Sequence, residues 1–132
     1  MGKTFGVGVL VLAATFCLLT TWTAATAPAA FAERLGLAVA NPGGRNEVRA
    51  QYAGFFFAVA VACVAALAGL LPRDSALIVL VVVFGGLIAG RVASLGLDGG
   101  VAGYTPTVLA LYAVDALGCA LSLAALLLDP GR

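Results

Sequence analysis

Four long apolar stretches, each the length of a membrane-crossing helix, constrain this chain more than any motif in it. A hydrocarbon core about 30 Å thick requires about 20 apolar residues of α-helix at about 1.5 Å per residue. Four windows meet that length: residues 5–23, 48–71, 75–95 and 105–128. None alternates or carries a charged stripe at helical period. We therefore predict an all-α integral membrane protein, a single domain over residues 1–132 built as a four-transmembrane-helix bundle.

The charge and the cysteine content limit which partners, metals and cofactors we expect. The net charge is +1 and the sequence contains no basic run, so we expect a lipid bilayer and no nucleic acid as partner. Cys17, Cys63 and Cys119 each lie deep inside an apolar window, and the chain has no His. We interpret them as small buried hydrophobes, and we predict no metal and no cofactor, although a bound lipid or quinone would fit the composition.

The first window has two interpretations. A lysine followed by an apolar run and the small residues 24–27 is also typical of a secretory signal with a cleavage site. We interpret it as a retained first transmembrane helix. After it, residues 28–30 are interpreted as a linker, and Phe31 to Val39 as a short interfacial helix, because its apolar residues cluster and it cannot span.

Caps and turns organise the remaining helices. We expect Asn46 to cap the second helix, and Asp74 or Ser75 to cap the third after a tight turn at Pro72. An even number of spans places both termini on one side. That side carries Lys3, Arg73 and Arg132. The other side carries Arg34 and Arg45, if Arg49 and Arg91 near the helix ends are functional and are not counted for topology. The charge bias favours cytoplasmic termini.

Most polar residues of the spans fall in the half of the bundle away from the termini. With antiparallel neighbours, the following six residues share that half, and we name them as a ligand-binding or structural polar cluster: Glu47, Arg49, Tyr52, Arg91, Asp98 and Asp115. Arg91, Ser94 and Asp98 are three and four residues apart, so they share a helix face.

Asp115 is the most demanding member of this cluster, because it lies about 15 Å into the fourth span. An unpaired carboxylate there costs at least about 2.5 to 3.5 kcal/mol, so we expect Arg49 or Arg91 within ion-pair reach. Such a pair is compatible with two roles: an interhelical ion pair that only fixes packing, or a charged pocket.

Two motifs resemble a known family. Residues 46–54 are similar to the Glu-x-Arg-Ala-x-Tyr-Gly-Gly opening of the second helix in small bacterial membrane proteins called domain of unknown function 4345, and Gly90-Arg91 through Asp98-Gly99 is similar to that family's third-helix motif. Ala53 replaces one glycine, and Asp115 stands where the family more often has a Glu. The resemblance implies a four-helix bundle, DoxX-like in plan, in a bacterial inner membrane. It implies no established activity.

Three functions remain open. The first is a non-enzymatic accessory or structural subunit of a larger membrane assembly, with other membrane protein subunits as partners. The second is a binder or carrier of a small amphiphile, such as a quinone, a lipid or an anionic metabolite, at the Arg and Asp cluster. An enzyme is the weakest hypothesis, because the usual catalytic residue types are missing. The small-residue ridges Gly86–Gly90 and Ala116–Ala120–Ala124 are expected to pack inside the bundle, and the alternative is an interface with another protein.

Overall fold

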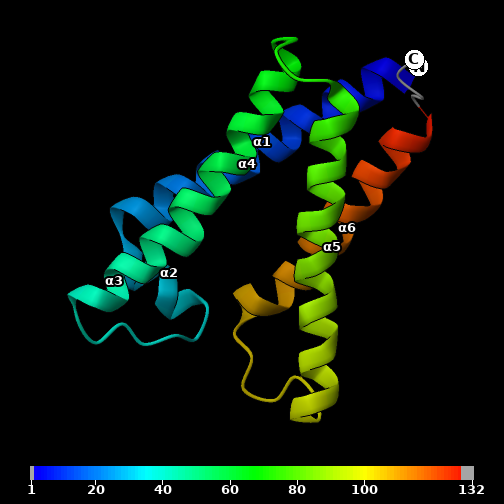
Figure 1. Ribbon diagram of the computed structural model, residues 1–132. Coiled ribbons are helices and arrows are strands. Elements are labelled where there is room, and N and C mark those ends of the chain that lie inside the picture. Colours follow the sequence, from blue (N-terminus) through cyan, green and yellow to red (C-terminus); the bar gives the residue numbers. More distant parts are fainter. Residues whose placement is uncertain (1, 129–132) are drawn as a thin grey trace.

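The structure, a computed structural model, describes residues 2–128 and is helical throughout apart from its connections (Figure 1). Four of its helices are long and apolar enough to cross a membrane. The predicted fold class is therefore confirmed. In chain order the elements are α1 (Gly2–Thr26), α2 (Pro28–Arg34), a continuous second span made of α3 (Pro42–Val48), the π-helical segment η1 (Arg49–Gly54) and α4 (Phe55–Leu67), then α5 (Arg73–Asp98) and α6 (Pro106–Leu128).

The second span begins and ends earlier than the predicted 48–71. Asn41 caps it, accepting a hydrogen bond from the Gly44 backbone N–H at 2.9 Å, so the expected cap at Asn46 is wrong. Pro42 follows the cap at the first helical position, where its missing N–H costs nothing. The span ends at Leu67, and Gly69 beyond it has a left-handed φ of 76°. Glycine adopts that φ without strain, and a residue in this left-handed conformation ends the helix.

The first and third spans are longer than predicted, and the fourth is one residue shorter. The first covers residues 2–26, the third 73–98 and the fourth 106–128. Pro72 precedes α5 in extended conformation without a side-chain cap, so the caps expected at Asp74 or Ser75 are wrong. Backbone N–H groups of Ser75 and Ala76 reach the Pro72 carbonyl instead, at 3.1 and 3.4 Å.

The short helix between the first two spans is present but displaced from the predicted Phe31–Val39. Pro28 lies at the start of α2, so the linker interpretation of residues 28–30 is wrong. The helix ends at Arg34 because Gly36 has a φ of 76°, and the N–H groups of residues 35–37 close the end on carbonyls of residues 32 and 33. The Phe31 ring lies 5.0 Å from the Tyr52 ring, which anchors α2 to the second span.

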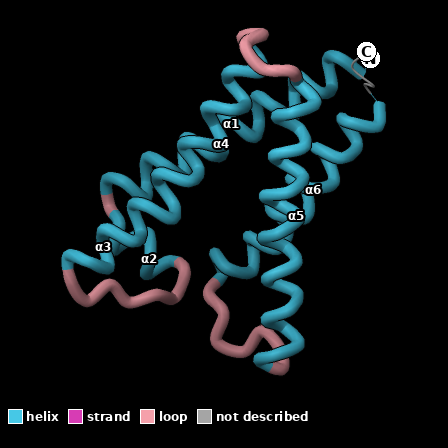
Figure 2. Tube along the Cα trace, in the orientation of Figure 1, coloured by secondary structure: helices cyan, strands magenta, loops and turns pink. Residues whose placement is uncertain are grey.

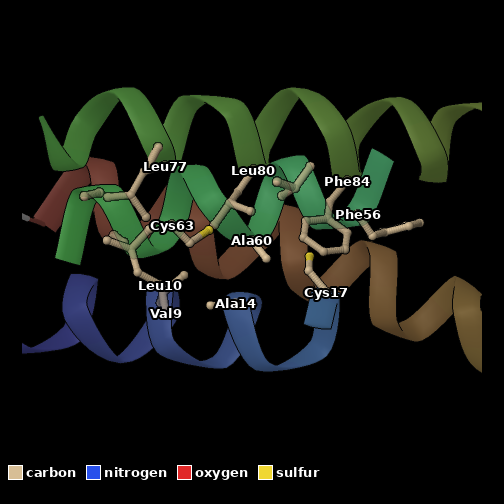
Figure 3. Packing of buried hydrophobic residues seen from close by; sticks show 14 residues of the cluster. Val9, Leu10, Ala14, Cys17, Phe56, Ala60, Cys63, Leu77, Leu80 and Phe84 are labelled. Carbon is tan, nitrogen blue, oxygen red and sulfur yellow. The ribbon is translucent and has the colours of Figure 1, made fainter. Parts of the chain in front are cut away.

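The spans are arranged as two pairs, α1 with α4 and α5 with α6 (Figure 1). The pairs meet near the termini and the short α4–α5 turn, and they diverge toward the longer connections at the other end (Figure 2). The main core lies where they meet, with Leu10, Cys63, Leu77 and Leu80 almost fully buried (Figure 3). The last buried residue of α5 is Phe84. The bundle therefore has a closed half near the termini and an open half beyond.

A second, smaller core holds α2 to the first pair in the open half. Its buried members are Ala24, Ala32, Val48 and Ala53. These side chains are small, so the helices approach each other closely by van der Waals packing, which drives helix association in lipid. The other pair has no comparable core at this end among the described residues, and the space between the pairs stays partly empty.

Candidate functional site

Arg91 and Asp115 form an ion pair between α5 and α6 at the start of the open half. The Arg91 Nε donates to Asp115 Oδ2 at 2.5 Å, and the Asp115 side chain is only 2% exposed, whereas that of Arg91 is 22% exposed. A carboxylate buried in a span requires such a partner. The expected ion pair is confirmed for Arg91.

Aromatic residues of α6 and of the preceding loop hold Arg91 in place. The Tyr112 hydroxyl donates to the Arg91 carbonyl at 2.9 Å, and the guanidinium carbon lies 5.8 Å from the centre of the Tyr112 ring. The Tyr104 ring stacks on the Tyr112 ring at 6.3 Å. A cation over an aromatic face is attracted by the ring quadrupole. These contacts keep the guanidinium at the boundary between the interior and the open end.

The ion pair borders a partly enclosed cavity of about 210 Å³ between the two helix pairs. Its walls are mostly apolar, but they include two arginines, one carboxylate and several hydroxyl groups. All four spans and α2 contribute side chains: Phe16, Thr20, Thr23, Phe31, Arg34, Leu35, Tyr52, Phe56, Leu87, Arg91, Thr107, Leu111 and Asp115. An apolar cavity with a few convergent polar groups is the usual form of a small-molecule site.

One hydrogen bond ties the two sides of the open end together. The Thr105 hydroxyl, just before α6, donates to the Arg34 carbonyl at the end of α2 at 2.6 Å. The same hydroxyl accepts from the Val108 N–H at 3.2 Å, as an N-cap does. Thr105 therefore starts α6 and also connects it to α2 beside the cavity, which positions Arg34 in the lining.

The π-helical segment η1 gives the second span its shape beside the cavity. π-helical turns are rare and concentrate at functional sites. The Thr21 hydroxyl of α1 donates to the Ala53 carbonyl at 3.2 Å, and the Arg49 Nε donates to the Ala25 carbonyl at 3.1 Å. Both bonds attach η1 to α1, and the segment directs Tyr52 into the lining of the cavity.

A comparison of the sequence with known protein families identifies the family of this chain. The sequence profile of the family described as domain of unknown function (DUF4345) matches residues 7–126. The chain belongs to this family. No curated protein and no solved structure matched it. Membership agrees with the resemblance seen in the two motifs, and it carries no established activity.

The two motifs of this DUF4345 member have different positions relative to the cavity. Tyr52 and Arg91 line it together with Asp115. Arg49 does not approach Asp115, because it turns toward α1, and Glu47 is exposed at the start of the second span. The structure thus brings together three of the six residues in the predicted cluster.

Asp98 lies farther out, at the end of α5. It is exposed and accepts a hydrogen bond from the Ser94 hydroxyl at 2.6 Å. Arg91, Ser94 and Asp98 all border one shallow hollow with Tyr104 and Tyr112, so the predicted common face is confirmed. Leu35 and Arg91 border both this hollow and the cavity.

Several residues of the site were missed from the sequence. Tyr112 had a usable signal, because it lies three residues before Asp115 and so shares its helix face. Thr20, Thr23 and Thr107 had none, since threonines in a span commonly bond to their own helix, as Thr20 does to the Phe16 carbonyl at 3.0 Å. Arg34 was assigned to topology only, because nothing in the sequence shows that α2 turns back over the cavity.

The cysteines take no part in the cavity. Cys17 and Cys63 are buried and free, and Cys119 is half-buried. The interpretation as buried hydrophobes holds for the first two. Within residues 2–128, no group of three His, Cys, Asp or Glu side chains could hold a metal ion.

Proposed function

We propose that this protein binds an amphiphile with a singly charged anionic head group, and that the head lies at Arg91 in the cavity between the helix pairs. The observation that carries the proposal is a cavity with mostly apolar walls and one charged corner, opening between spans. A ligand with a polar head and a hydrocarbon body matches such walls. Lateral entry from the bilayer would suit it, because the pairs diverge there (Figure 1).

The charge of the lining supports an anionic head. Two arginines, Arg34 and Arg91, and one carboxylate, Asp115, line the cavity, so its formal charge is one positive. Arg91 uses only its Nε toward Asp115, and its terminal amino groups make no hydrogen bond within residues 2–128. A planar guanidinium with free amino groups binds carboxylate or phosphate oxygens in a directed way. An anionic lipid or metabolite therefore fits better than a neutral quinone.

Asp115 acts in this proposal as a positioning partner of Arg91 and not as an acid or base. A lone guanidinium in a span is costly, and the Asp115 carboxylate neutralises its charge. Because the carboxylate binds only the Nε, the terminal amino groups of Arg91 remain available to a ligand. The proposed role therefore requires no chemical transformation of the ligand.

Purification in mild detergent followed by mass spectrometry of the extracted small molecules tests the proposal. The wild type should retain a singly anionic amphiphile at close to one per chain. A double variant, Arg91→Gln with Asp115→Asn, keeps a neutral hydrogen-bonding pair and removes both charges. We expect it to retain at least about tenfold less, the equivalent of about 1.4 kcal/mol.

Arg45→Gln is the matched control, since Arg45 is exposed at the same end and lines no part of the cavity. It should retain the ligand as the wild type does. Equal retention by all three proteins would contradict the proposal. Recovery of a stoichiometric protein subunit without any amphiphile would favour the accessory-subunit function instead.

The accessory-subunit function is supported by a separate observation. Gly86 and Gly90 are exposed, and a Cβ built on either meets no atom within 4 Å. Ala116 and Ala120 are exposed as well. The expectation that these ridges pack inside the bundle is therefore wrong for these residues. Small residues on an outer face permit close approach of another helix, which is what a subunit interface in lipid uses.

We further propose that the termini face the cytoplasm of a bacterial inner membrane, from the charge bias of the connections. Arg132 lies outside the described residues, so the test uses single cysteines at Lys3 and Arg45 in a chain whose native cysteines are replaced. An impermeant thiol reagent added from outside should label position 45 and not position 3. Equal labelling of both positions would contradict this orientation.

A further inference from the structure

A second cavity continues from the first along the seam between α1 and α6. Its volume is about 240 Å³ and its lining is almost wholly apolar. Phe16 borders both cavities. On α6 the first cavity ends at Asp115, and the second extends from Val114 to Ser122, about two helical turns closer to the termini. The two cavities therefore follow each other along the same pair of helices.

Three aromatic rings lie where the two cavities adjoin. The Phe16 ring lies 6.2 Å from the Phe84 ring and 6.2 Å from the Phe56 ring. Phe56 lines the first cavity and Phe84 the second. Phe16 itself is only half-buried. Among residues 2–128 it is the only residue that borders both cavities, so its side chain lies at their junction.

Gly118 lets the Phe84 ring lie against the α6 backbone in the lining of the second cavity. A Cβ built at this position would lie 2.7 to 2.9 Å from carbons of the Phe84 ring. The ring therefore rests directly on the α6 backbone, and any side chain at position 118 would displace it. An apolar cavity on the order of 150 Å³ already holds a benzene-sized molecule, so this space is large enough for a ligand.

Ser122 at the far end is a polar group without a partner. Its side chain is 1% exposed and its hydroxyl makes no hydrogen bond within the described residues. A serine in a helix normally bonds to a carbonyl of the preceding turn, so this hydroxyl bordering the cavity is unusual. The far end of the space is not filled by the chain's own packing.

We propose that the hydrocarbon chain of the bound amphiphile passes Phe16 and occupies this second cavity, so that the site selects ligands by chain length. This inference rests on the proposed function, because it requires a head group at Arg91. It identifies the ligand as a long-chain monoanionic amphiphile, such as a fatty acid or a singly charged lipid, and excludes short-chain metabolites as the preferred occupants.

The test compares palmitate with hexanoate as probes, by native mass spectrometry of the purified protein in a non-ionic detergent. Hexanoate supplies the same carboxylate head, but its chain is too short to pass Phe16. Ala13→Leu adds volume inside the second cavity, since Ala13 borders it and is half-buried. We expect this variant to bind palmitate about tenfold less than the wild type and hexanoate within about twofold.

Ala58→Leu is the matched control, because Ala58 is exposed on α4 and borders neither cavity. It should bind both probes as the wild type does. If Ala13→Leu does not fold, Ser122→Leu fills the same space from α6 and removes the unpartnered hydroxyl. The double variant Arg91→Gln with Asp115→Asn should lose binding of both probes equally, because both carry the same carboxylate head. This result distinguishes the contribution of the head group from that of the hydrocarbon chain.

The outcomes distinguish the two proposals. Two results in a folded cavity-filling variant would overturn the chain-length inference while the head-group proposal stands. One is unchanged palmitate binding, and the other is an equal loss of palmitate and hexanoate binding in that same variant. If the wild type binds neither probe, the proposed function fails and this inference fails with it. A selective loss of palmitate would support both.

Discussion

The closed half and the open half of this bundle differ in what holds them together. In the closed half, the α1–α4 and α5–α6 pairs share one apolar core that includes Leu10, Leu77 and Leu80 (Figure 3). In the open half, α5 contributes no buried residue after Phe84, and the small core around α2 involves the first pair. The contacts between pairs there become polar ones, such as the Thr105–Arg34 hydrogen bond.

The difference shows where a membrane bundle can hold a polar site. Lipid tails are as apolar as leucine, so helices associate in lipid mainly by close packing. In the closed half, the space left by the packing is the second cavity, whose lining is almost wholly apolar. Where the pairs diverge, charged groups such as Arg91 and Asp115 can neutralise each other beside open space. The closed half therefore positions the helices and leaves only apolar space, and the open half provides the charged part of the site.

The largest expected effect is in the open half. Asp115→Asn leaves the Arg91 charge without its partner, and we expect a loss of about 3 kcal/mol in stability, the lower end for a buried pair because Arg91 is 22% exposed. Thermal unfolding in detergent measures it. Adding Arg91→Gln should restore part of the loss. No change in Asp115→Asn would mean that the open half does not depend on this pair.

A core truncation examines the closed half. Leu80 is fully buried, and Leu80→Ala should cost about 2 kcal/mol, near the low end for such truncations, because in lipid the loss is of packing contacts rather than of transfer from water. The control is Leu97→Ala on the same helix, whose leucine is 86% exposed and should cost close to nothing. Similar losses in urea or thermal unfolding of both variants would remove the contrast between the halves.

The boundary between the halves is sensitive to added volume. Gly118→Ala places a methyl group against the Phe84 ring, and we expect a loss of about 1 to 2 kcal/mol. Gly86→Ala on the exposed face of α5 meets no atom and should be neutral or slightly stabilising by helix propensity. Measured side by side in thermal unfolding, a destabilised Gly86→Ala would show that its face is occupied by another helix.

The smallest expected effect is at η1. Thr21→Val removes the hydroxyl that donates to the Ala53 carbonyl and should cost about 0.6 kcal/mol, the average for such bonds between membrane helices. Thr15→Val is the control, since Thr15 bonds only within its own helix. Hydrogen exchange of the amides near residue 53 should rise in Thr21→Val alone. Equal exchange in both variants would indicate that η1 keeps its shape without α1.

Much of this structure could be predicted from local pattern. Long apolar runs identify spans in any sequence, and the cost of a buried carboxylate predicts a cation beside Asp115. The choice between Arg49 and Arg91 could not be made, since both lie at compatible depths. Only the attachment of Arg49 to the Ala25 carbonyl shows that its side chain is already engaged with α1.

The error at the start of the second span shows the limit of local propensity. Asn41 and Asn46 are both favourable N-cap residues, and the residues between them include proline and two glycines. Local propensity therefore does not show which of the two asparagines begins the helix. The structure selects Asn41, whose side chain accepts the hydrogen bond from the Gly44 N–H.

By itself the sequence determined that the chain is helical, crosses a membrane four times and must neutralise Asp115, because the exclusion of water from lipid leaves no alternative for the backbone or for a charge. The tertiary structure alone decided that the helix pairs diverge, which arginine is used, and that two cavities follow the seam between α1 and α6. Those features depend on side chains that are distant in sequence, such as Phe84 on Gly118, and their packing is not encoded in any local pattern.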